Sequence, residues 1–330
     1  MAIKGYRQAL TDALREEMAR DASVICFGED MTKYGGAFGV SRGLVEEFGP
    51  ERVFDTPISE TLIAGAACGA AIMGLRPVIE IMFIDFSTQT LDVVVNQMAK
   101  FKLMSGSQAS VPVVLRTQGG TGRGAAAQHS QSLEAWYTHI PGLKVVMPAT
   151  PRDAKGLLKS AIRDDDPVIF IEHKRLYCEK GEVPEDGCLI PLGEAEIKRE
   201  GRDITIMATS WMVHNALAAA EKLAEAGIDS ELVDPRTLVP FDEAALARSV
   251  KKTGRLLIVQ EACRRAGFAS EVASQVGETL FDDLDGPVRI LAGSNVPMPF
   301  CTDLEQHCIP SVDRIVQTAT EICTGRLVKG

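Results

Sequence analysis

The sequence predicts an α/β protein of two domains, in which mainly parallel sheets are flanked by helices. Its 330 residues exceed what one hydrophobic core ordinarily supports. Short apolar runs bounded by Gly, Pro or Asp alternate with helical stretches, which is typical of parallel sheets. This alternation is interrupted once, at 178–202, by a segment rich in charge, Gly and Pro. We therefore expect domains at 1–185 and 200–330, joined by a linker at 186–199.

The first domain is expected to open with a helix over 5–20, because its apolar residues recur at helical spacing. The helix expected over 61–74 is dense in Ala and Gly, which allow close approach of the backbone. Five short apolar runs predict strands at 23–27, 77–83, 111–117, 143–147 and 167–172.

The second domain repeats the alternation of strands and helices. One helix is expected to start after Asp242, an N-cap acid, and to end at Gly254. A terminal helix is expected near 311–323. The apolar runs of this half predict strands at 204–210, 230–234, 255–260 and 288–292.

Composition excludes several classes of protein. With 45% hydrophobic and 24% charged residues, the chain has the composition of a soluble globular protein. A net charge of −10 argues against binding to nucleic acid, whose phosphates select basic surfaces, and against anionic membranes. We expect no signal peptide, and the given sequence has no apolar run of about 20 residues. The eight cysteines form no CxxC pair, so we expect reduced thiols in a cytoplasmic protein.

A glycine-rich loop follows the strand expected at 111–117. Gly120, Gly122 and Ala125 fit the dinucleotide-binding pattern GxGxxG/A. That pattern also needs an acid at the end of the next strand, where the sequence has Pro148. A nicotinamide-dependent enzyme is therefore disfavoured, although it remains an alternative, as does a binding subunit without catalysis.

Three segments carry candidate functional residues. Glu60 starts the Ala/Gly-rich helix, where a carboxylate is either a partner of the helix dipole or a reactive group. Phe86 and Gln89 follow the strand at 77–83, and strand ends are where open α/β sheets bind ligands; Phe86 also fits core packing. His129 lies among small and polar residues in AAAQHSQS, which suits a site residue or an ordinary surface histidine.

Several stretches resemble the beta subunits of the 2-oxo acid dehydrogenase family, which includes pyruvate, branched-chain 2-oxo acid and acetoin dehydrogenases. They occur in the family's order across essentially the whole chain, as DTPISE with the small-residue helix, GLRPVIEIMFIDFS, GAAAQHSQSLEAWYTHIPGLKVVMP and DAKGLLKSAIRDDDPVIF. The resemblance implies a transketolase-like pyrimidine-binding domain and a transketolase C-terminal domain. It also implies an α₂β₂ heterotetramer with thiamine diphosphate as cofactor.

The resemblance assigns roles to single residues. Glu60 matches the glutamate that bonds to N1′ of the cofactor's pyrimidine and so helps to remove the thiazolium proton. Phe86 matches the aromatic residue that stacks on the pyrimidine, with Ile58 and Gln89 close to the same ring. His129 matches the histidine that orients the substrate carboxylate or the lipoyl group. A structural potassium ion is implied at carbonyl oxygens around Val113, Ala161, Ile162, Asp164 and Asp166.

The half of the cofactor site that binds the diphosphate is absent from the sequence. The wider thiamine class binds the diphosphate through Mg²⁺ with a GDG motif, and the nearest string here is Glu185-Asp186-Gly187. We therefore expect an alpha subunit to supply Mg²⁺ and the diphosphate site, and the chain to be active only with it. This argues against a self-sufficient transketolase.

The implied reaction is oxidative decarboxylation of pyruvate with transfer of the acyl group to a lipoyl group on a separate acyltransferase. The segment 34–44 and Phe86 favour pyruvate, whereas 171–174 and GEVPE resemble acetoin dehydrogenases. A branched-chain 2-oxo acid is a further alternative. The family's acyltransferase docks on the C-terminal domain through a small basic module, which fits the acids Asp282, Asp283, Asp285 and Asp303.

Overall fold

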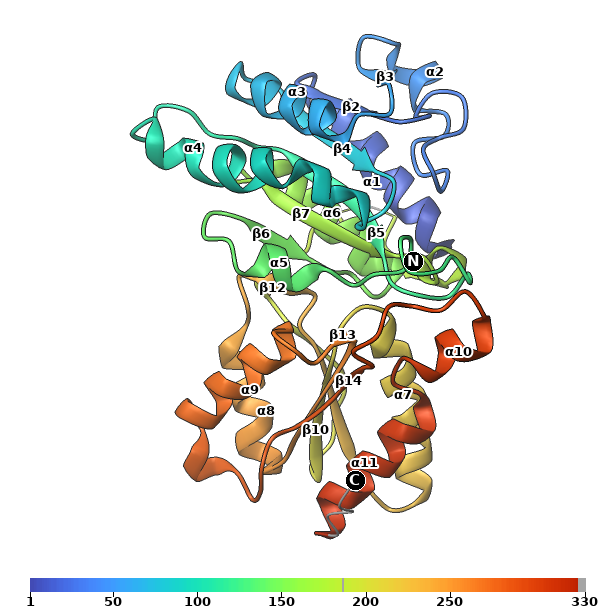
Figure 1. The fold of residues 1–330 in the computed structure, drawn as a ribbon, viewed down its shortest axis with the longest axis vertical. Helices are drawn as coiled ribbons and strands as arrows, with labels where there is room; N and C mark the ends of the chain where they lie inside the picture. Colours follow the sequence, from blue (N-terminus) through green and yellow to red (C-terminus); the bar gives the residue numbers. More distant parts are fainter. Residues whose placement is uncertain (186, 326–330) are drawn as a thin grey trace. The chain divides into compact units, whose positions relative to one another are not determined.

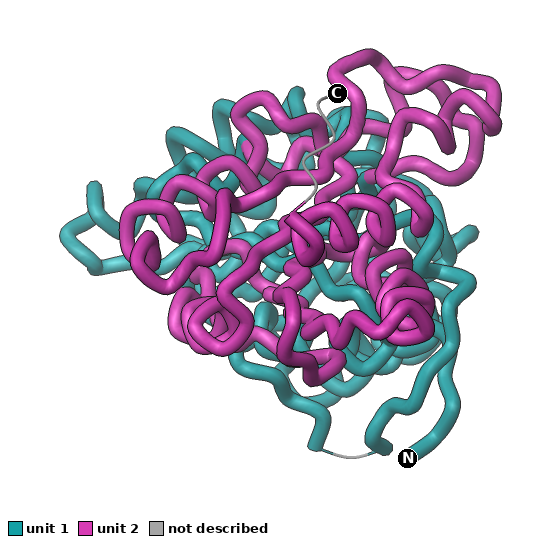
Figure 2. Tube along the Cα trace, turned by 90° about the horizontal axis from the view of Figure 1, so that it is seen from below, with its two compact units in different colours: residues 1–119, 136–192 teal, residues 120–135, 193–330 magenta. Residues whose placement is uncertain are grey.

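The computed structural model describes residues 1–185 and 187–325. The chain forms two compact units (Figure 2). The first unit comprises 1–119 and 136–192, and the second comprises 120–135 and the chain from Gly193 onward. In the part of the chain that the structure describes, no helix has the length and apolar character needed to span a bilayer.

The first unit is built on a parallel sheet with the strand order β6-β7-β5-β4-β2-β3 (Figure 1). Most of these strands are buried on both faces, which is why they appear in the sequence as nearly continuous apolar runs. The strands are β2 (Val24–Gly28), β3 (Val53–Asp55), β4 (Arg76–Ile81), β5 (Val114–Gly119), β6 (Lys144–Val146) and β7 (Val168–His173). A separate pair, β1 (Ala2–Gly5) and β8 (Lys180–Val183), is antiparallel.

Helices pack around this sheet. The helices α1 (Tyr6–Arg20) and α6 (Pro151–Arg163) lie against each other, and α3 (Glu60–Ile72) packs on β4. Thr150 caps α6 by accepting a hydrogen bond from the backbone N–H of Asp153, with Pro151 in the first turn. The shorter helices are α2 (Leu44–Phe48), η1 (Phe86–Thr90), η2 (Val93–Met98), α4 (Ala99–Met104), α5 (Glu134–Thr138) and η3 (Leu176–Cys178).

The second unit has its own sheet, in the order β14-β13-β10-β11-β9, with only β9 antiparallel to its neighbour. Asp242 and Gly254 bound one helix as predicted, because Asp242 accepts from the Ala245 N–H and Gly254 is left-handed. The strands are β9 (Glu196–Arg199), β10 (Ile204–Ala208), β11 (Ser230–Asp234), β12 (Thr237–Val239), β13 (Leu256–Cys263) and β14 (Arg289–Gly293). The helices are α7 (Trp211–Glu225), α8 (Glu243–Thr253), α9 (Phe268–Thr279), η4 (Phe281–Asp283), α10 (Thr302–His307) and α11 (Val312–Thr324).

The predicted fold class, two α/β domains with mainly parallel sheets, is confirmed. The units differ in detail from the expected domain limits. The first unit continues to Leu192, and the expected linker at 186–199, whose residue 186 lies outside the described residues, contains β9. The segment 120–135 groups with the second unit, although it precedes the rest of that unit in the sequence.

Candidate cofactor site

Two of the candidate segments come together in the first unit. Pro57 follows β3 and disfavours helix before it, and α3 begins at Glu60. The hydroxyl of the next residue, Thr61, donates a hydrogen bond to the backbone carbonyl of Gln89 at 2.7 Å. The structure therefore places the start of α3 beside η1, the turn that carries Phe86 and Gln89.

These residues differ in their exposure. Glu60 is buried, with 5% of its surface exposed, and Phe86 is half-buried. Gln89 is exposed, and Ile58 is 83% exposed. A buried carboxyl group next to a half-buried aromatic ring suits an aminopyrimidine, which offers a ring nitrogen and a flat face. The residues present therefore fit the pyrimidine end of thiamine diphosphate.

A second acid lies close to Glu60. Glu29 directly follows β2 and is buried, with 6% of its surface exposed. Burial raises the pKa of Glu29, and the negative charge of Glu60 raises it further. Sequence reasoning missed Glu29, although a carboxylate at the end of the buried strand VICFG was a usable signal.

A row of aromatic side chains leads to Phe86. Phe86 meets Phe83 edge-on, with ring centroids 5.4 Å apart, and Phe83 meets Phe38 edge-on at 5.8 Å. Phe38 in turn stacks on Tyr177, with centroids 4.9 Å apart and planes 17° apart. These contacts hold the ring of Phe86 in one orientation.

A buried ionic network lies at the other end of this row. The guanidinium of Arg116 in β5 binds both carboxylate oxygens of Glu172 in β7, at 2.7 and 2.9 Å, and Glu80 in β4 at 2.9 Å. The Tyr177 hydroxyl donates to Glu172 at 2.5 Å. All four side chains are at most 4% exposed. Because the guanidinium is shared between two carboxylates, the network fixes three adjacent strands and Tyr177 together.

The same network holds the loop that carries Phe38. Glu80 accepts a hydrogen bond from the backbone N–H of Ala37 at 2.8 Å. Gly36, before it, has a φ of +76°, and a Cβ there would lie 2.4 Å from the Glu80 carboxylate. The sequence signal for this network is a set of charged residues inside apolar strands.

His129 lies in the second unit, in the loop that follows β5. Within the described residues 120–133 no helix begins, and the next helix, α5, starts at Glu134. A dinucleotide site needs a helix directly after the glycine turn, so the glycine pattern is not a nucleotide fingerprint here. Its glycines serve turn geometry instead, since Gly120 and Gly122 have φ values of 79° and 113°.

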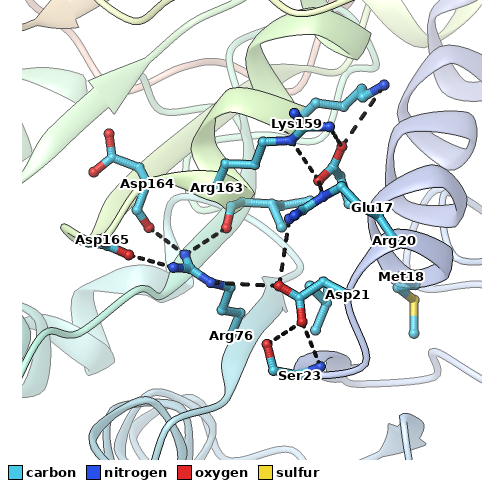
Figure 3. A network of polar contacts seen from close by, with 12 residues as sticks. Glu17, Met18, Arg20, Asp21, Ser23, Arg76, Lys159, Arg163, Asp164 and Asp165 are labelled. Atoms are coloured by element: carbon cyan, nitrogen blue, oxygen red, sulfur yellow. Dashed lines mark hydrogen bonds and ion pairs between the residues drawn. The ribbon is translucent and has the colours of Figure 1, made fainter. Parts of the chain in front are cut away.

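The residues predicted around potassium gather where α6 ends and β7 begins. Figure 3 shows Arg76 reaching the backbone at this end of α6. Its guanidinium donates to the carbonyls of Ile162 and Asp164 at 3.1 and 2.9 Å. The Lys144 ammonium lies 2.6 Å from the carboxylate of Asp164. Two of the predicted oxygen-bearing residues therefore already have cationic partners from the protein.

The other predicted potassium ligands also have protein partners. The carbonyl of Val113 accepts from the Val168 N–H at 2.9 Å, and that of Ala161 accepts from the Asp164 N–H at 3.3 Å. Asp166 pairs with Lys102 at 2.6 Å. Over residues 1–185 and 187–325 no three His, Cys, Asp or Glu side chains are arranged to hold a metal ion. Potassium at this corner stays a prediction.

Two family models match the chain. The transketolase pyrimidine binding domain matches residues 4–180, and the transketolase C-terminal domain matches residues 193–315. The fold is also that of a solved structure, a split gene transketolase in an inactive beta4 tetramer. That comparison has a TM-score of 0.80 and 23% identity, and it covers 97% of this chain and 99% of the other.

Curated relatives are similar over nearly the whole chain. The beta subunit of acetoin:2,6-dichlorophenolindophenol oxidoreductase from Bacillus subtilis is 48% identical over 326 residues, which are 95% of each chain. Subunit beta-2 of the mitochondrial pyruvate dehydrogenase E1 component of Oryza sativa subsp. japonica is 47% identical, over 96% of this chain and 85% of that one. The 2-oxoisovalerate dehydrogenase subunit beta of Bacillus subtilis is 44% identical, over 98% and 99%. The chain therefore belongs to the family of transketolase-like beta subunits of 2-oxo acid and acetoin dehydrogenases.

Proposed function

We propose that this chain is the beta subunit of a thiamine-diphosphate-dependent pyruvate dehydrogenase. With an alpha subunit it would catalyse the oxidative decarboxylation of pyruvate and pass the acetyl group to a lipoyl group. The observation that carries the proposal is the buried carboxyl of Glu60 at the start of α3, beside the turn that bears Phe86. Pyruvate is favoured as the substrate by the segment 34–44 and by Phe86, and a pyruvate dehydrogenase beta subunit is among the relatives, at 47% identity.

Each site residue has a role in this proposal. Thiamine diphosphate, when bound, supplies the carbon nucleophile that proteins lack. Glu60 holds a proton at the pyrimidine N1′, and its burial keeps water from competing for that hydrogen bond. Phe86 would hold the pyrimidine ring, together with Ile58 and Gln89. His129 orients the carboxylate of the substrate and moves a proton.

An alpha subunit would cover part of the first unit. Large apolar side chains on or next to α3 and α4 are more than half exposed, among them Ile58, Leu62, Met73, Leu103 and Met104. Exposed apolar side chains in such number are typical of a protein interface. The same partner would supply Mg²⁺ and the diphosphate site, for which this sequence lacks the GDG motif.

Acetoin is the second candidate substrate, supported by one buried side chain. Gln118 at the end of β5 is fully buried, and neither atom of its amide has a hydrogen-bond partner among the described residues. The backbone carbonyl of Gln118 accepts a hydrogen bond from the backbone N–H of Ile84, just before η1. A buried amide needs both a donor and an acceptor as partners, and acetoin offers a hydroxyl and a carbonyl, whereas pyruvate offers only acceptors.

A substrate panel tests the proposal. The chain and its alpha subunit would be produced together and assayed with pyruvate, acetoin and 2-oxoisovalerate. We expect the highest kcat/KM with pyruvate. A kcat/KM for acetoin about tenfold above that for pyruvate corresponds to a difference of about 1.4 kcal/mol in transition-state binding, and it would replace pyruvate by acetoin as the substrate.

Gln118→Leu, with the exposed Gln97→Leu as its control, shows whether the amide of Gln118 contributes to the preference between these substrates.

The lipoyl acyltransferase is proposed to dock on the second unit. There a groove of about 710 Å³ lies beside α9 and β14 and is lined by Phe281 and Asp285. Asp282, Asp283 and Asp303 are also exposed, which suits a basic docking module. Neutralising these four acids to Asn is expected to weaken the complex in pull-down assays, and unchanged binding would refute this docking surface.

We also propose a cytoplasmic location for the assembly.

A further inference from the structure

The sheet of the second unit has a point at which its strand order reverses. From the central strand β10 the chain passes through α7 to β11 on one side, and β13 then pairs with β10 on the other side. Open α/β sheets bind ligands at the carboxyl ends of the two strands that flank such a point. Here the carboxyl end of β13 holds a segment of the chain itself. The backbone N–H of Thr121 donates to the carboxylate of Glu261 at 2.6 Å, and both residues are buried.

The backbone that presents Glu261 is held tightly. A Cβ on Gly293 of β14 would lie 2.1 Å from the carbonyl oxygen of Glu261, so the two strands are as close as glycine allows. The neighbouring Gln260 donates to the carbonyl of Cys263 at 2.9 Å and accepts from the Ala269 N–H at 2.8 Å. The carboxylate of Glu261 therefore extends from a rigid part of the second unit.

The segment bound by Glu261 is a closed loop. The backbone N–H of Gly120 donates to the carbonyl of Gln131 at 2.9 Å, which joins the two ends of the loop. Gly124 has a φ of +59°, and a Cβ there would lie 3.0 Å from the carbonyl oxygen of Phe300. Ala126 is left-handed, with a φ of 63°, and its carbonyl accepts from the N–H of His129 at 3.4 Å. The loop has strained turns that persist only where contacts hold them.

We propose that Glu261 is a positioning residue for the reaction of this subunit, because it fixes the loop 120–131 and thereby His129. The inference rests on the role proposed above for His129. A hydrogen bond to a carboxylate is about twice as strong as one between neutral groups. Removing the carboxylate leaves the buried N–H of Thr121 without a partner, which favours loop conformations in which water reaches it.

A second acid supports a functional cluster at this place. Glu134 follows the loop, is 3% exposed, and one of its carboxylate oxygens has no hydrogen-bond partner among the described residues. Burial raises the pKa of Glu134 to about 7, and the charge of Glu261 contributes to the rise. Two buried acids close enough to interact are costly to a fold, and such costs are concentrated at functional sites.

The test uses the complete complex with its alpha subunit. Glu261→Ala removes the acceptor, Glu261→Gln keeps an oxygen at the same place, and Glu278→Ala removes an exposed acid of α9 as a matched control. Amide hydrogen exchange is measured for peptides covering 118–133 and, as an internal reference, for α7. Steady-state kinetics and calorimetric titration with thiamine diphosphate are run on the same samples.

For Glu261→Ala we expect exchange in 118–133 to become about tenfold faster with α7 unchanged, and kcat/KM for the 2-oxo acid to fall by about tenfold. The affinity for thiamine diphosphate should stay within about twofold, because Glu60 and Phe86 are untouched. Glu261→Gln should recover most of both losses, and Glu278→Ala should match the wild type.

Unchanged exchange in 118–133 would overturn the proposal. Equal acceleration in α7 would also overturn it, because the carboxylate would then support the whole unit and not the loop. Failure of the underlying function has a different signature. If His129→Ala turns over normally, the role of the histidine is refuted, whereas the exchange data still report whether Glu261 holds the loop.

Discussion

Glu60, the first residue of α3, is an acid that is buried in the folded chain. A second acid, Glu29, has a pKa raised by burial and by the charge of Glu60. A carboxyl group that is buried at a helix start is suited to form a hydrogen bond with the ring nitrogen of an aminopyrimidine cofactor. The burial of Glu60 therefore supports a chemical role over a simple interaction with the helix dipole.

Glu60→Gln tests this role directly. The amide has the same size but cannot exchange a proton with N1′, so we expect kcat to fall by about 100-fold or more in the reconstituted complex. Steady-state turnover with the preferred substrate measures the effect, and Glu46→Gln, an exposed acid in α2, is the control. Turnover equal to that of the control would reduce Glu60 to a partner of the helix dipole.

Glu134 gives a prediction about pH. Its pKa is raised from 4.5 to about 7 by burial and by Glu261, so between these values the folded protein binds more protons than the unfolded chain. The free energy of unfolding therefore falls as pH rises from 4.5 to 7, by about 3 kcal/mol from this group. Glu134→Gln removes that fall. Denaturant unfolding should show the variant gaining stability over the wild type between pH 5 and pH 8, and a difference independent of pH would contradict the assignment.

The loop that carries Phe38 is fixed by the carboxylate of Glu80 from strand β4. Gly36→Ala should be damaging for two reasons, because its φ is +76° and its new Cβ would meet Glu80. Gly43 is a matched control, since it is left-handed with a φ of +84° and a Cβ there would meet nothing closer than 3.9 Å. Both variants should lose about 1–2 kcal/mol for the left-handed backbone.

Only Gly36→Ala should lose about 1–3 kcal/mol more and bind thiamine diphosphate more weakly. Urea unfolding and calorimetric titration of the two variants, each in complex with the alpha subunit, measure the difference. An equal loss of unfolding free energy at the two positions would show that Glu80 moves away from the new methyl group at little cost. The loop would then not be fixed by Glu80.

Much of the fold could be predicted from the sequence because its signals are local. Buried parallel strands are apolar runs, and the boundaries of α8 follow from Asp242 and Gly254. A helix start and a strand end make Glu60 and Phe86 candidates, but only the resemblance to the family assigns their roles, which stay predictions. The Arg116 network was missed because its members are far apart in the sequence, and only the register that sets Glu80 beside Arg116 brings them together. Likewise, no local pattern shows that a loop after β5 packs with the second unit.

The first unit has exposed apolar side chains that a partner is expected to cover. The chain alone should show no turnover, and adding the alpha subunit should restore it, because the diphosphate site is expected there. Leu62→Glu introduces a charge on the exposed side of α3 and should weaken assembly in size-exclusion chromatography. Leu189→Glu is the control, since Leu189 is also exposed but lies outside α3. Full activity of the isolated chain would refute the shared site.

The grouping of 120–135 with the second unit has a consequence for recombination between relatives. A crossover at residue 193 would take the loop 120–135 from one parent and Glu261 and Phe300 from the other. The loop contacts both residues, so these contacts would then be made between sequences from different parents. Chimeras made at that boundary should be poorly tolerated where the parents differ at these positions, and transplanting the loop together with the C-terminal half should rescue them. The residues that should be exchanged together, 120–135 and those from Gly193 onward, are therefore not contiguous in the sequence.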